Sequence, residues 1–292
     1  MRVVHLTDLH VQRAPGVREL MGKRLIGSAN LYVLGRRSKF SEEVQRAAVS
    51  TALEAKPDLV ILTGDLTAQG LDSEFEGALE LLRPLLDAAP AVIIAGNHDT
   101  YVAEPSPADR MRRYFAPWMG AGSPHLHEFG EVAVLTLETC RAHLLSSGHT
   151  PPDQIAAAER LLGSLPATGA PFVFLAQHYP LRGRDGAAYG PFTRALSNAA
   201  EVEAMISRTD RVGAVLHGHE HHGFRTTVPG KGGPVPIFDP GASGYSRIPE
   251  LRRTAHLNIY EVDRAGIQHL RRLAWSGTQF LDEEGGPYAT GR

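Results

Sequence analysis

The chain has 292 residues, about the largest size that a single hydrophobic core supports, and we therefore expect one domain rather than two equal ones. Apolar residues form 42% and charged residues 21% of the sequence, which is typical of a globular protein and excludes a largely disordered chain. The formal net charge of −2 excludes a long-range positive field that would attract nucleic acid or anionic membranes.

The cysteine content and the first residues bear on the compartment. The single cysteine, Cys140, excludes an internal disulfide and a thiolate metal cluster. The first ten residues run directly into a strand-like pattern, without the apolar stretch of a signal peptide or a membrane-spanning helix. We therefore expect a cytoplasmic protein.

Strands and helices alternate over the first three quarters of the sequence. Short runs of β-branched and other apolar residues predict buried strands, and amphipathic segments between them predict helices. Ser73 with Glu76 has the spacing of a capping box and would open the second of these helices. The predicted strands are residues 2–7, 59–63, 91–95, 132–137, 172–177 and 212–217. The predicted helices are residues 41–55, 73–86, 108–115, 153–165 and 198–207.

The final quarter of the sequence has a different pattern. After His222, short strands are separated by turns rich in glycine and proline. Alternating strands and helices followed by antiparallel strands predict an α/β fold of two packed, mixed β-sheets with helices on the outside. We expect a single domain over residues 1–281. The glycine-rich end of the chain, residues 282–292, is predicted to be a flexible tail.

Polar clusters follow the predicted strands at their carboxyl ends, where open α/β sheets place their ligands. The clusters are Asp8-Leu9-His10, Gly64-Asp65, Gly96-Asn97-His98-Asp99, His178 and His217-Gly218-His219-Glu220-His221. Any one of them alone could be an ordinary turn or a surface histidine. Together they would bring several ionisable groups to one sheet edge, where like charges repel and burial costs solvation. Bound cations remove that objection, so the pattern indicates a metal site.

The same motifs, complete and in order over about residues 2–222, resemble those of the calcineurin-like metallophosphoesterase superfamily. The resemblance implies a four-layer αββα fold and two metal ions bridged by Asp65. The implied ligands of the first metal are Asp8, His10, Asp65 and His221, and those of the second are Asp65, Asn97, His178 and His219. These donors suit divalent or mixed-valence ions of Mn²⁺, Fe or Zn²⁺ without selecting among them. No tyrosine stands beside Gly64-Asp65, unlike in the purple acid phosphatases.

The resemblance also implies the chemistry. Two metals about 3.5–4 Å apart hold a hydroxide that attacks the phosphorus in line, and they clamp the phosphoryl oxygens. His98 would stabilise the developing charge or protonate the leaving oxygen, and Asp99 would orient its ring. The alternative for His98 is a packed structural histidine. His217 and His222 could line the cleft or have structural roles, and the remaining histidines show no metal-ligand spacing.

The residues around the motifs bear on the kind of phosphoester. Serine/threonine protein phosphatases of the superfamily carry an arginine in the segment after Gly-Asp and a glutamate after Gly-Asn-His, whereas this chain has Leu66-Thr67-Ala68-Gln69-Gly70 and Asp99. Residues 64–82 look more like the class III cyclic-nucleotide phosphodiesterases. We therefore expect a small phosphoester as the partner, hydrolysed as a phosphodiester that is either a cyclic nucleotide or another small compound. The motif residues themselves would bind only the metals and the phosphate, and they do not select the rest of the substrate.

Residues 11–40 form a longer connection than is usual after a first strand. They contain seven basic residues and one acidic residue, interleaved with apolar side chains. This composition predicts a cap that binds an amphiphilic anion or contacts a membrane surface, and a solvated loop is the alternative. A UDP-diacylglucosamine-type pyrophosphohydrolase of the same superfamily is accordingly the second enzymatic hypothesis. A non-catalytic interaction scaffold is a third, which the presence of His98 argues against.

Overall fold

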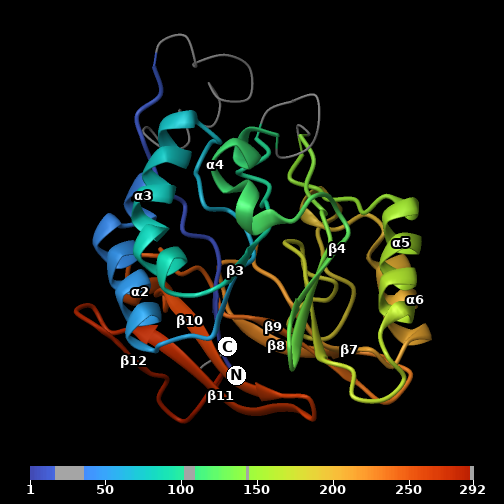
Figure 1. Ribbon diagram of the computed structural model, residues 1–292. Helices are drawn as coiled ribbons and strands as arrows, with labels where there is room; N and C mark the ends of the chain where they lie inside the picture. The colour runs from blue at the N-terminus through green and yellow to red at the C-terminus, as the bar shows by residue number, and fades with distance from the viewer. Residues whose placement is uncertain (17–35, 102–108, 143–144, 290–292) are drawn as a thin grey trace.

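The computed structural model describes residues 1–16, 36–101, 109–142 and 145–289. Two six-stranded mixed β-sheets pack face to face with helices on both outer faces (Figure 1), which confirms the predicted fold class. Sheet 1 contains, in spatial order, β12 (Phe280–Asp282), β11 (Gly266–Trp275), β10 (His256–Asp263), β1 (Arg2–Leu6), β2 (Leu59–Leu62) and β3 (Ala91–Ile93). Sheet 2 contains, in spatial order, β4 (His125–Phe129), β5 (Val132–Thr136), β6 (Phe172–Ala176), β7 (Val212–Leu216), β9 (Val235–Asp239) and β8 (Phe224–Val228).

The parallel strands of the two sheets end at the same edge of the sandwich. In sheet 1, β1, β2 and β3 run parallel, and in sheet 2, β5, β6, β7 and β9 do. Side chains that follow β1, β2 and β3 contact side chains that follow β6 and β7. The polar motifs of the sequence therefore converge on this edge.

Helices complete the outer layers. On sheet 1 lie α2 (Glu42–Glu54) and α3 (Asp72–Ala88), and α4 (Asp109–Met119) packs on α3 and β3. On the other side of the sandwich, α5 (Pro152–Ser164) and α6 (Ala199–Arg208) cover sheet 2 (Figure 1). One apolar cluster fills the space between the sheets, and one more lies under the helices on each side.

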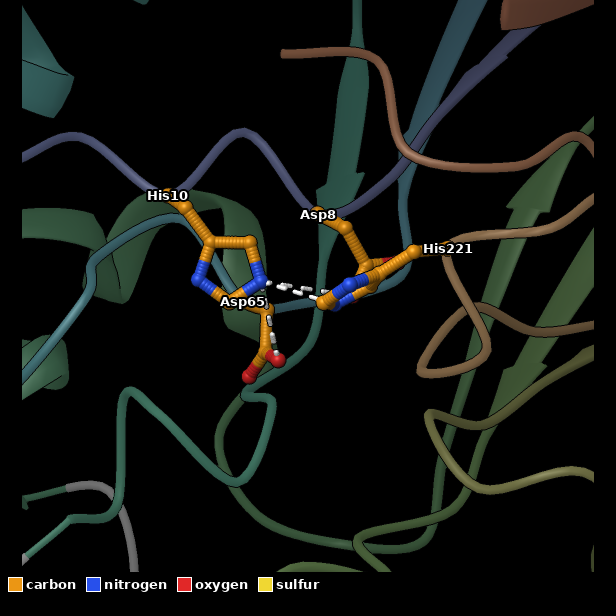
Figure 2. Close-up of side chains that lie close together, drawn as sticks. All are labelled: Asp8, His10, Asp65 and His221. Carbon is orange, nitrogen blue, oxygen red and sulfur yellow. Dashed lines mark hydrogen bonds and ion pairs between the residues drawn. The ribbon is translucent and has the colours of Figure 1, made fainter. Parts of the chain in front are cut away.

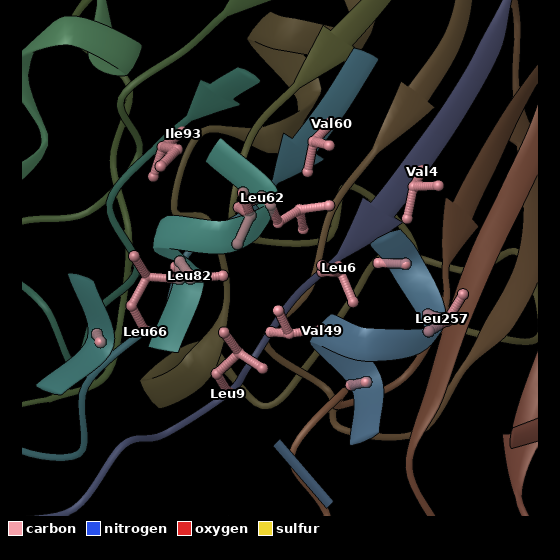
Figure 3. Packing of buried hydrophobic residues seen from close by; sticks show 14 of the residues in the cluster. Val4, Leu6, Leu9, Val49, Val60, Leu62, Leu66, Leu82, Ile93 and Leu257 are labelled. Carbon is pink, nitrogen blue, oxygen red and sulfur yellow. The ribbon is translucent and has the colours of Figure 1, made fainter. Parts of the chain in front are cut away.

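The first strand shows why the central segments read as continuous apolar runs. Val4 and Leu6 of β1 face the helices of sheet 1, together with Leu62 of β2 (Figure 3). Val3 faces the other way and packs in the cluster between the sheets. Because both faces of the strand are covered, every position of this kind is buried, and each such side chain contributes about 1.5–3 kcal/mol.

Most predicted elements agree with the structure to within a few residues, but one predicted helix cap is wrong and one strand was not predicted. The capping box of Ser73 with Glu76 is not formed, because α3 already begins at Asp72. Its amino end is held by Glu74, whose Oε2 accepts from the backbone amides of Gln69 at 2.8 Å and Leu71 at 3.2 Å. Strand β4 was missed because its polar residues gave no apolar run.

The predicted flexible tail, residues 282–292, is partly held by contacts with the domain. Asp282 ends β12, and the next residue, Glu283, is 3% exposed at its side chain and forms an ion pair of 2.8 Å with Arg272. The backbone amide of Tyr288 donates to Glu283 as well, at 2.8 Å. Glu283 and Tyr288 are therefore held against the domain, because a buried guanidinium needs its carboxylate partner.

The segment 11–40 is described only at its two ends. Val11 pairs with Thr67, and Phe40 pairs with Tyr245, so both ends are joined to the domain. Residues 17–35 lie outside the described residues, and the predicted cap therefore stays a prediction. Within the described part of the chain, no helix combines the length and the apolar character needed to cross a bilayer.

Candidate metal centre

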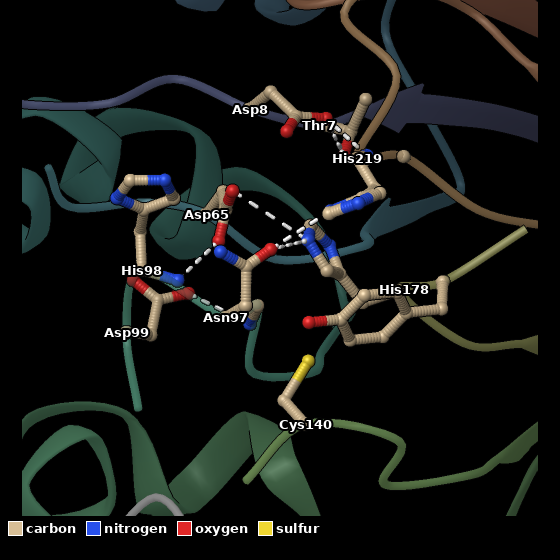
Figure 4. A network of polar contacts seen from close by, with 12 residues as sticks. Thr7, Asp8, Asp65, Asn97, His98, Asp99, Cys140, His178 and His219 are labelled. Carbon is tan, nitrogen blue, oxygen red and sulfur yellow. Dashed lines mark hydrogen bonds and ion pairs between the residues drawn. The ribbon is translucent and has the colours of Figure 1, made fainter. Parts of the chain in front are cut away.

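The structure gathers all seven side chains that were predicted to bind metal. They lie at the edge where the parallel strands of both sheets end, and each follows its strand within a few residues. Four of these side chains point toward one another in Figure 2, namely Asp8, His10, Asp65 and His221. The remaining three, Asn97, His178 and His219, lie on the other side of Asp65 (Figure 4).

The first group has the spacing of ligands around one ion. Oδ1 of Asp8 lies 3.2 Å from Nε2 of His221 and 3.7 Å from Nε2 of His10. Oδ2 of Asp65 lies 3.5 Å from the same nitrogen of His10. Two donors that each sit about 2.1 Å from an ion are separated by roughly 3.0–3.4 Å, so these distances fit a shared cation.

The second group is built around the amide oxygen of Asn97. This Oδ1 lies 3.1 Å from Nε2 of His178 and 2.8 Å from Nδ1 of His219. Nε2 of His178 is also 3.5 Å from Oδ2 of Asp65. The same oxygen of Asp65 thus faces both groups, which is the geometry required of a bridging carboxylate.

Orphaned oxygens provide an independent test of whether cations fit. Oδ1 of Asp8 and Oδ2 of Asp65 are buried and lack a hydrogen-bond partner. A buried carboxylate oxygen without a partner is costly, and a cation satisfies it better than any neutral group. These are the oxygens that face the imidazoles, so the residues present fit a metal pair.

Hydrogen bonds behind the ligands select the tautomer of two histidines. Nδ1 of His178 lies 2.7 Å from the backbone oxygen of Thr63, and Nε2 of His219 lies 3.1 Å from that of Arg194. A neutral ring that donates to a carbonyl keeps its other nitrogen as a lone-pair donor. In both rings that other nitrogen faces Asn97, as a metal ligand would.

The backbone around the ligands is in an unusual conformation. Left-handed φ angles occur at five ligand residues, 51° at Asp8, 52° at His10, 53° at Asp65, 75° at His219 and 59° at His221. Each such residue costs on the order of 1–3 kcal/mol when it is not glycine. The strain turns the chain sharply after each strand and directs the side chains to one point.

The motif glycines are needed for close approach. A Cβ on Gly96 would collide with the backbone nitrogen and Oδ1 of Asp65, and a Cβ on Gly218 would collide with Thr7 and Asp8. Any larger residue would displace a carboxylate from the centre. Steric crowding therefore explains why glycine stands at these positions of the Gly-Asn-His-Asp and Gly-His-x-His motifs.

Electrostatics in the site favour charged carboxylates. Burial opposes the ionisation of Asp8, but the imidazoles of His10 and His221 hold its pKa well below the usual range. Burial likewise opposes the charged form of His178, yet Asp65 raises the pKa of this ring to about 9. An ion held by His178 would take the place of this proton, so metal binding at the second group would release protons.

His98 is fixed at both its backbone and its ring. Its backbone amide donates to Oδ1 of Asp65 at 2.7 Å, and its Nδ1 donates to the backbone oxygen of Ala68 at 2.6 Å. The ring lies edge-on to His10, with centroids 4.7 Å apart. This places the imidazole beside the first group of ligands.

The expected role of Asp99 is not what the structure shows. Its carboxylate accepts from the backbone amides of Leu66, Thr67 and Gly96 and from the hydroxyl of Thr67, at 2.8–3.2 Å. The ring of His98 is oriented by Ala68 instead. Asp99 therefore joins the Gly96 turn to the segment that carries Asp65. The role of the Ala68 carbonyl could not be predicted, because backbone partners leave no signal in the sequence.

A model of the family described as calcineurin-like phosphoesterase matches residues 1–223. The chain belongs to this family. A curated relative, phosphodiesterase YaeI of Escherichia coli (strain K12), is 36% identical over 52 residues, which cover 18% of this chain and 19% of YaeI. The alignment with YaeI therefore spans about a fifth of that protein's length.

Two solved structures share the fold. Purple acid phosphatase PPD1 from yellow lupin (Lupinus luteus) seeds has a TM-score of 0.63 and 15% identity, over 96% of this chain and 52% of that one. A dimetal phosphatase from Danio rerio has a TM-score of 0.57 and 13% identity, over 96% of this chain and 98% of that one. At these identities the likeness is one of fold alone.

In this member of the calcineurin-like phosphoesterase family, a cleft of about 390 Å³ opens over the metal residues. Its walls are predominantly polar and include residues that no motif indicated. These additional residues are Lys39, Phe40, Ser146, Arg194, Tyr245 and Arg253. They come from loops and turns far apart in the sequence, and no periodic pattern could have grouped them.

Aromatic rings form part of the cleft wall beside the first group of ligands. The ring centroid of Phe40 lies 4.3 Å from that of His10, 5.4 Å from His221 and 5.2 Å from Tyr245. This packing restricts the rotamers of both histidines.

The two histidines that flank the Gly-His-x-His motif have different positions. His217 is fully buried, with Nδ1 2.9 Å from the backbone oxygen of Gly218 and 3.5 Å from Oδ2 of Asp239. His222 lines the cleft. The sequence left both possibilities open for each of them, and the structure assigns only His222 to the cleft.

Proposed function

We propose that the chain is a metal-dependent phosphodiesterase that hydrolyses a small phosphodiester, such as a cyclic nucleotide. The observation that carries this proposal is the cleft of about 390 Å³ above the metal residues. Its volume lies in the range of roughly 300–1,000 Å³ that is typical of small-molecule sites. The predominantly polar walls among the described residues favour a polar diester over the amphiphilic substrate of a UDP-diacylglucosamine-type pyrophosphohydrolase.

The surroundings of Asp65 also support a diester rather than a phosphoprotein. The segment after Gly64-Asp65, in which the protein phosphatases carry an arginine, contains none here, and the hydroxyl of its Thr67 is buried in a hydrogen bond of 2.8 Å with Asp99. No cation reaches the cleft from this segment among the residues described. The name phosphodiesterase given to YaeI agrees with this proposal over the short aligned region.

The residues divide into metal ligands and a proton donor. When bound here, divalent Mn²⁺, Fe or Zn²⁺ would supply Lewis-acid stabilisation of the phosphoryl oxygens and lower the pKa of water. We assign Asp8, His10 and His221 to the first ion, with Asp65 between the two. The second ion would be held by Asn97, His178 and His219.

His98 is the proposed general acid. Because its Nδ1 is engaged by the backbone oxygen of Ala68, Nε2 is the nitrogen that can hand a proton to the leaving oxygen. The imidazole ring lines the cleft, and histidine is the side chain that most often acts as a general acid in enzymes. The same ring in its charged form would stabilise negative charge on the phosphoryl oxygens.

Hydrolysis of bis-p-nitrophenyl phosphate tests the proposal. We expect turnover that requires a divalent cation, ceases with a chelator and returns when the cation is restored. The monoester p-nitrophenyl phosphate should be the poorer substrate by kcat/KM. Turnover of the monoester alone would identify a phosphomonoesterase instead, and no turnover with any of Mn²⁺, Fe²⁺ or Zn²⁺ would favour the non-catalytic scaffold.

A further inference from the structure

One wall of the cleft is built from two segments that are hydrogen-bonded to each other. The backbone oxygen of Lys39 accepts from the amide of Ser246 at 2.8 Å, and Phe40 pairs with Tyr245. The second segment folds back on itself, because Arg253 pairs with Ile248. Lys39 and Arg253 both line the cleft on this wall, and neither belongs to a metal motif.

The guanidinium of Arg253 is held in place from two sides. Its Nε donates to Nε2 of His222 at 2.7 Å. Its Cζ lies 6.0 Å from the ring centroid of Tyr245, within the range of a cation–π contact. Because Nε is engaged, the two terminal amino groups form the part of the fork that can meet a phosphate.

The charge of this wall is not balanced by the protein. Arg194, the other arginine of the cleft, lies 3.7 Å from Glu220, and Glu220 also accepts from the hydroxyl of Tyr189. By contrast, no ion pair joins Lys39 or Arg253 to a carboxylate in the described part of the chain. An anionic ligand is the natural complement of two such cations that line the same cleft.

We propose that Lys39 and Arg253 form a second anion subsite, and that the preferred substrates are phosphodiesters carrying a further phosphate group. This inference rests on the proposed function, because it presumes that the scissile phosphate lies over the metal residues. The second phosphate then belongs to another part of the same substrate, such as the sugar of a nucleotide. A solvated pair of surface cations, or cations that contact the scissile phosphate itself, are the two alternatives.

A matched pair of chromogenic substrates separates these possibilities. Thymidine 5′-(p-nitrophenyl phosphate) and its 3′-phosphorylated form share the leaving group and differ only in the second phosphate. We expect the 3′-phosphate to lower KM by about tenfold, the size of one charge-assisted hydrogen bond. In Arg253→Gln the ratio of the two KM values should fall toward one. Arg225→Gln, a change of an exposed arginine on β8, should keep the ratio of the wild type.

Two results would overturn the subsite. The wild type could show no preference for the 3′-phosphorylated substrate, which would leave the cations merely solvated. Alternatively, Arg253→Gln could raise both KM values and keep their ratio, which would place Arg253 at the scissile phosphate. Unchanged thermal unfolding of the variant shows that a lost preference does not come from misfolding.

A binding measurement keeps this inference separate from the proposed function. Calorimetric titration of the Mn²⁺-loaded protein with thymidine 3′,5′-bisphosphate and with thymidine 5′-phosphate needs no turnover. About tenfold tighter binding of the bisphosphate in the wild type, lost in Arg253→Gln, supports the subsite even if neither diester is hydrolysed. Equal affinities in the wild type would contradict it, whatever the enzyme activity.

Discussion

The backbone amide of His98 donates a hydrogen bond of 2.7 Å to Oδ1 of Asp65. This bond joins the proposed proton donor to the carboxylate that faces both groups of ligands. It also occupies one oxygen of Asp65, so that the other, Oδ2, is directed at the imidazoles of His10 and His178. The proposed bridging carboxylate and the proposed proton donor thus lie on two turns that this bond joins, and they would act through different atoms.

Replacement of His98 should therefore separate metal binding from turnover. His98→Ala keeps the backbone amide, so we expect metal content to be unchanged and kcat to fall about 10²–10⁴-fold, the scale of a positioned general acid. The loss should be smaller for diesters with good leaving groups, which need little protonation. Steady-state kinetics with a series of aryl leaving groups measures this.

The control for this variant is His269→Ala, a change of an exposed histidine on β11 that should leave kcat unaltered. An equal loss for good and poor leaving groups would assign His98 to charge stabilisation rather than to acid catalysis.

Asp99 should act on stability rather than on the orientation of the His98 ring. Asp99→Ala leaves the buried amides of Leu66, Thr67 and Gly96 without an acceptor, and we expect a loss of about 2–4 kcal/mol in the free energy of unfolding. Thr67→Val, which removes the hydroxyl with its bonds to Asp99 and Gly70 but keeps the three amide bonds of Asp99, should cost less. Chemical denaturation measures both changes, and an Asp99→Ala variant of normal stability but low kcat would restore the orienting role.

Glu138 should make stability depend on pH. Burial raises the pKa of this carboxyl to about 7, above the value of 4.5 expected for an exposed glutamate. The folded chain then binds more protons than the unfolded chain between these values, so stability falls as pH rises through this window. We expect Glu138→Gln to flatten this slope between pH 5 and pH 8 in thermal unfolding. A slope identical to that of the wild type would show that the carboxyl is already ionised in the folded state.

Removal of bound cations should destabilise the fold. Oδ1 of Asp8 and Oδ2 of Asp65 are buried without partners, and the ligand residues adopt left-handed backbone conformations that binding offsets. We expect a chelator to lower Tm by about 5 °C or more, as an order of magnitude for a chain of this size. Asp65→Ala should be insensitive to the chelator, whereas an equal drop in that variant would place the metal elsewhere.

The fold and the convergence of the seven candidate ligands could be predicted because their signals are local. The central strands are buried on both faces, so they appear as apolar runs, and each ligand follows its strand directly, as Asp8 follows β1. Left-handed backbone at Asp8 and Asp65 sharpens the turns without altering this order.

The remaining features depend on contacts between distant segments. Arg253 enters the cleft from a turn after β9, and its partner His222 lies 31 positions away, so neither residue indicates the other in the sequence. Glu283 looked like part of a glycine-rich tail, but its pairing with the buried Arg272 draws the end of the chain into the domain. The expected contact of Asp99 with the His98 ring is not formed, because the two neighbours in sequence point to different partners.

Elemental analysis of the purified protein after loading with Mn²⁺ tests most directly whether Asp65 bridges a pair of metal ions. We expect two ions per chain in the wild type, a loss at both sites in Asp65→Ala, and a loss chiefly at the first site in Asp8→Ala, because only Asp65 faces both groups of ligands. A wild-type chain that binds one ion or none, or an Asp65→Ala variant that retains two, would contradict the account.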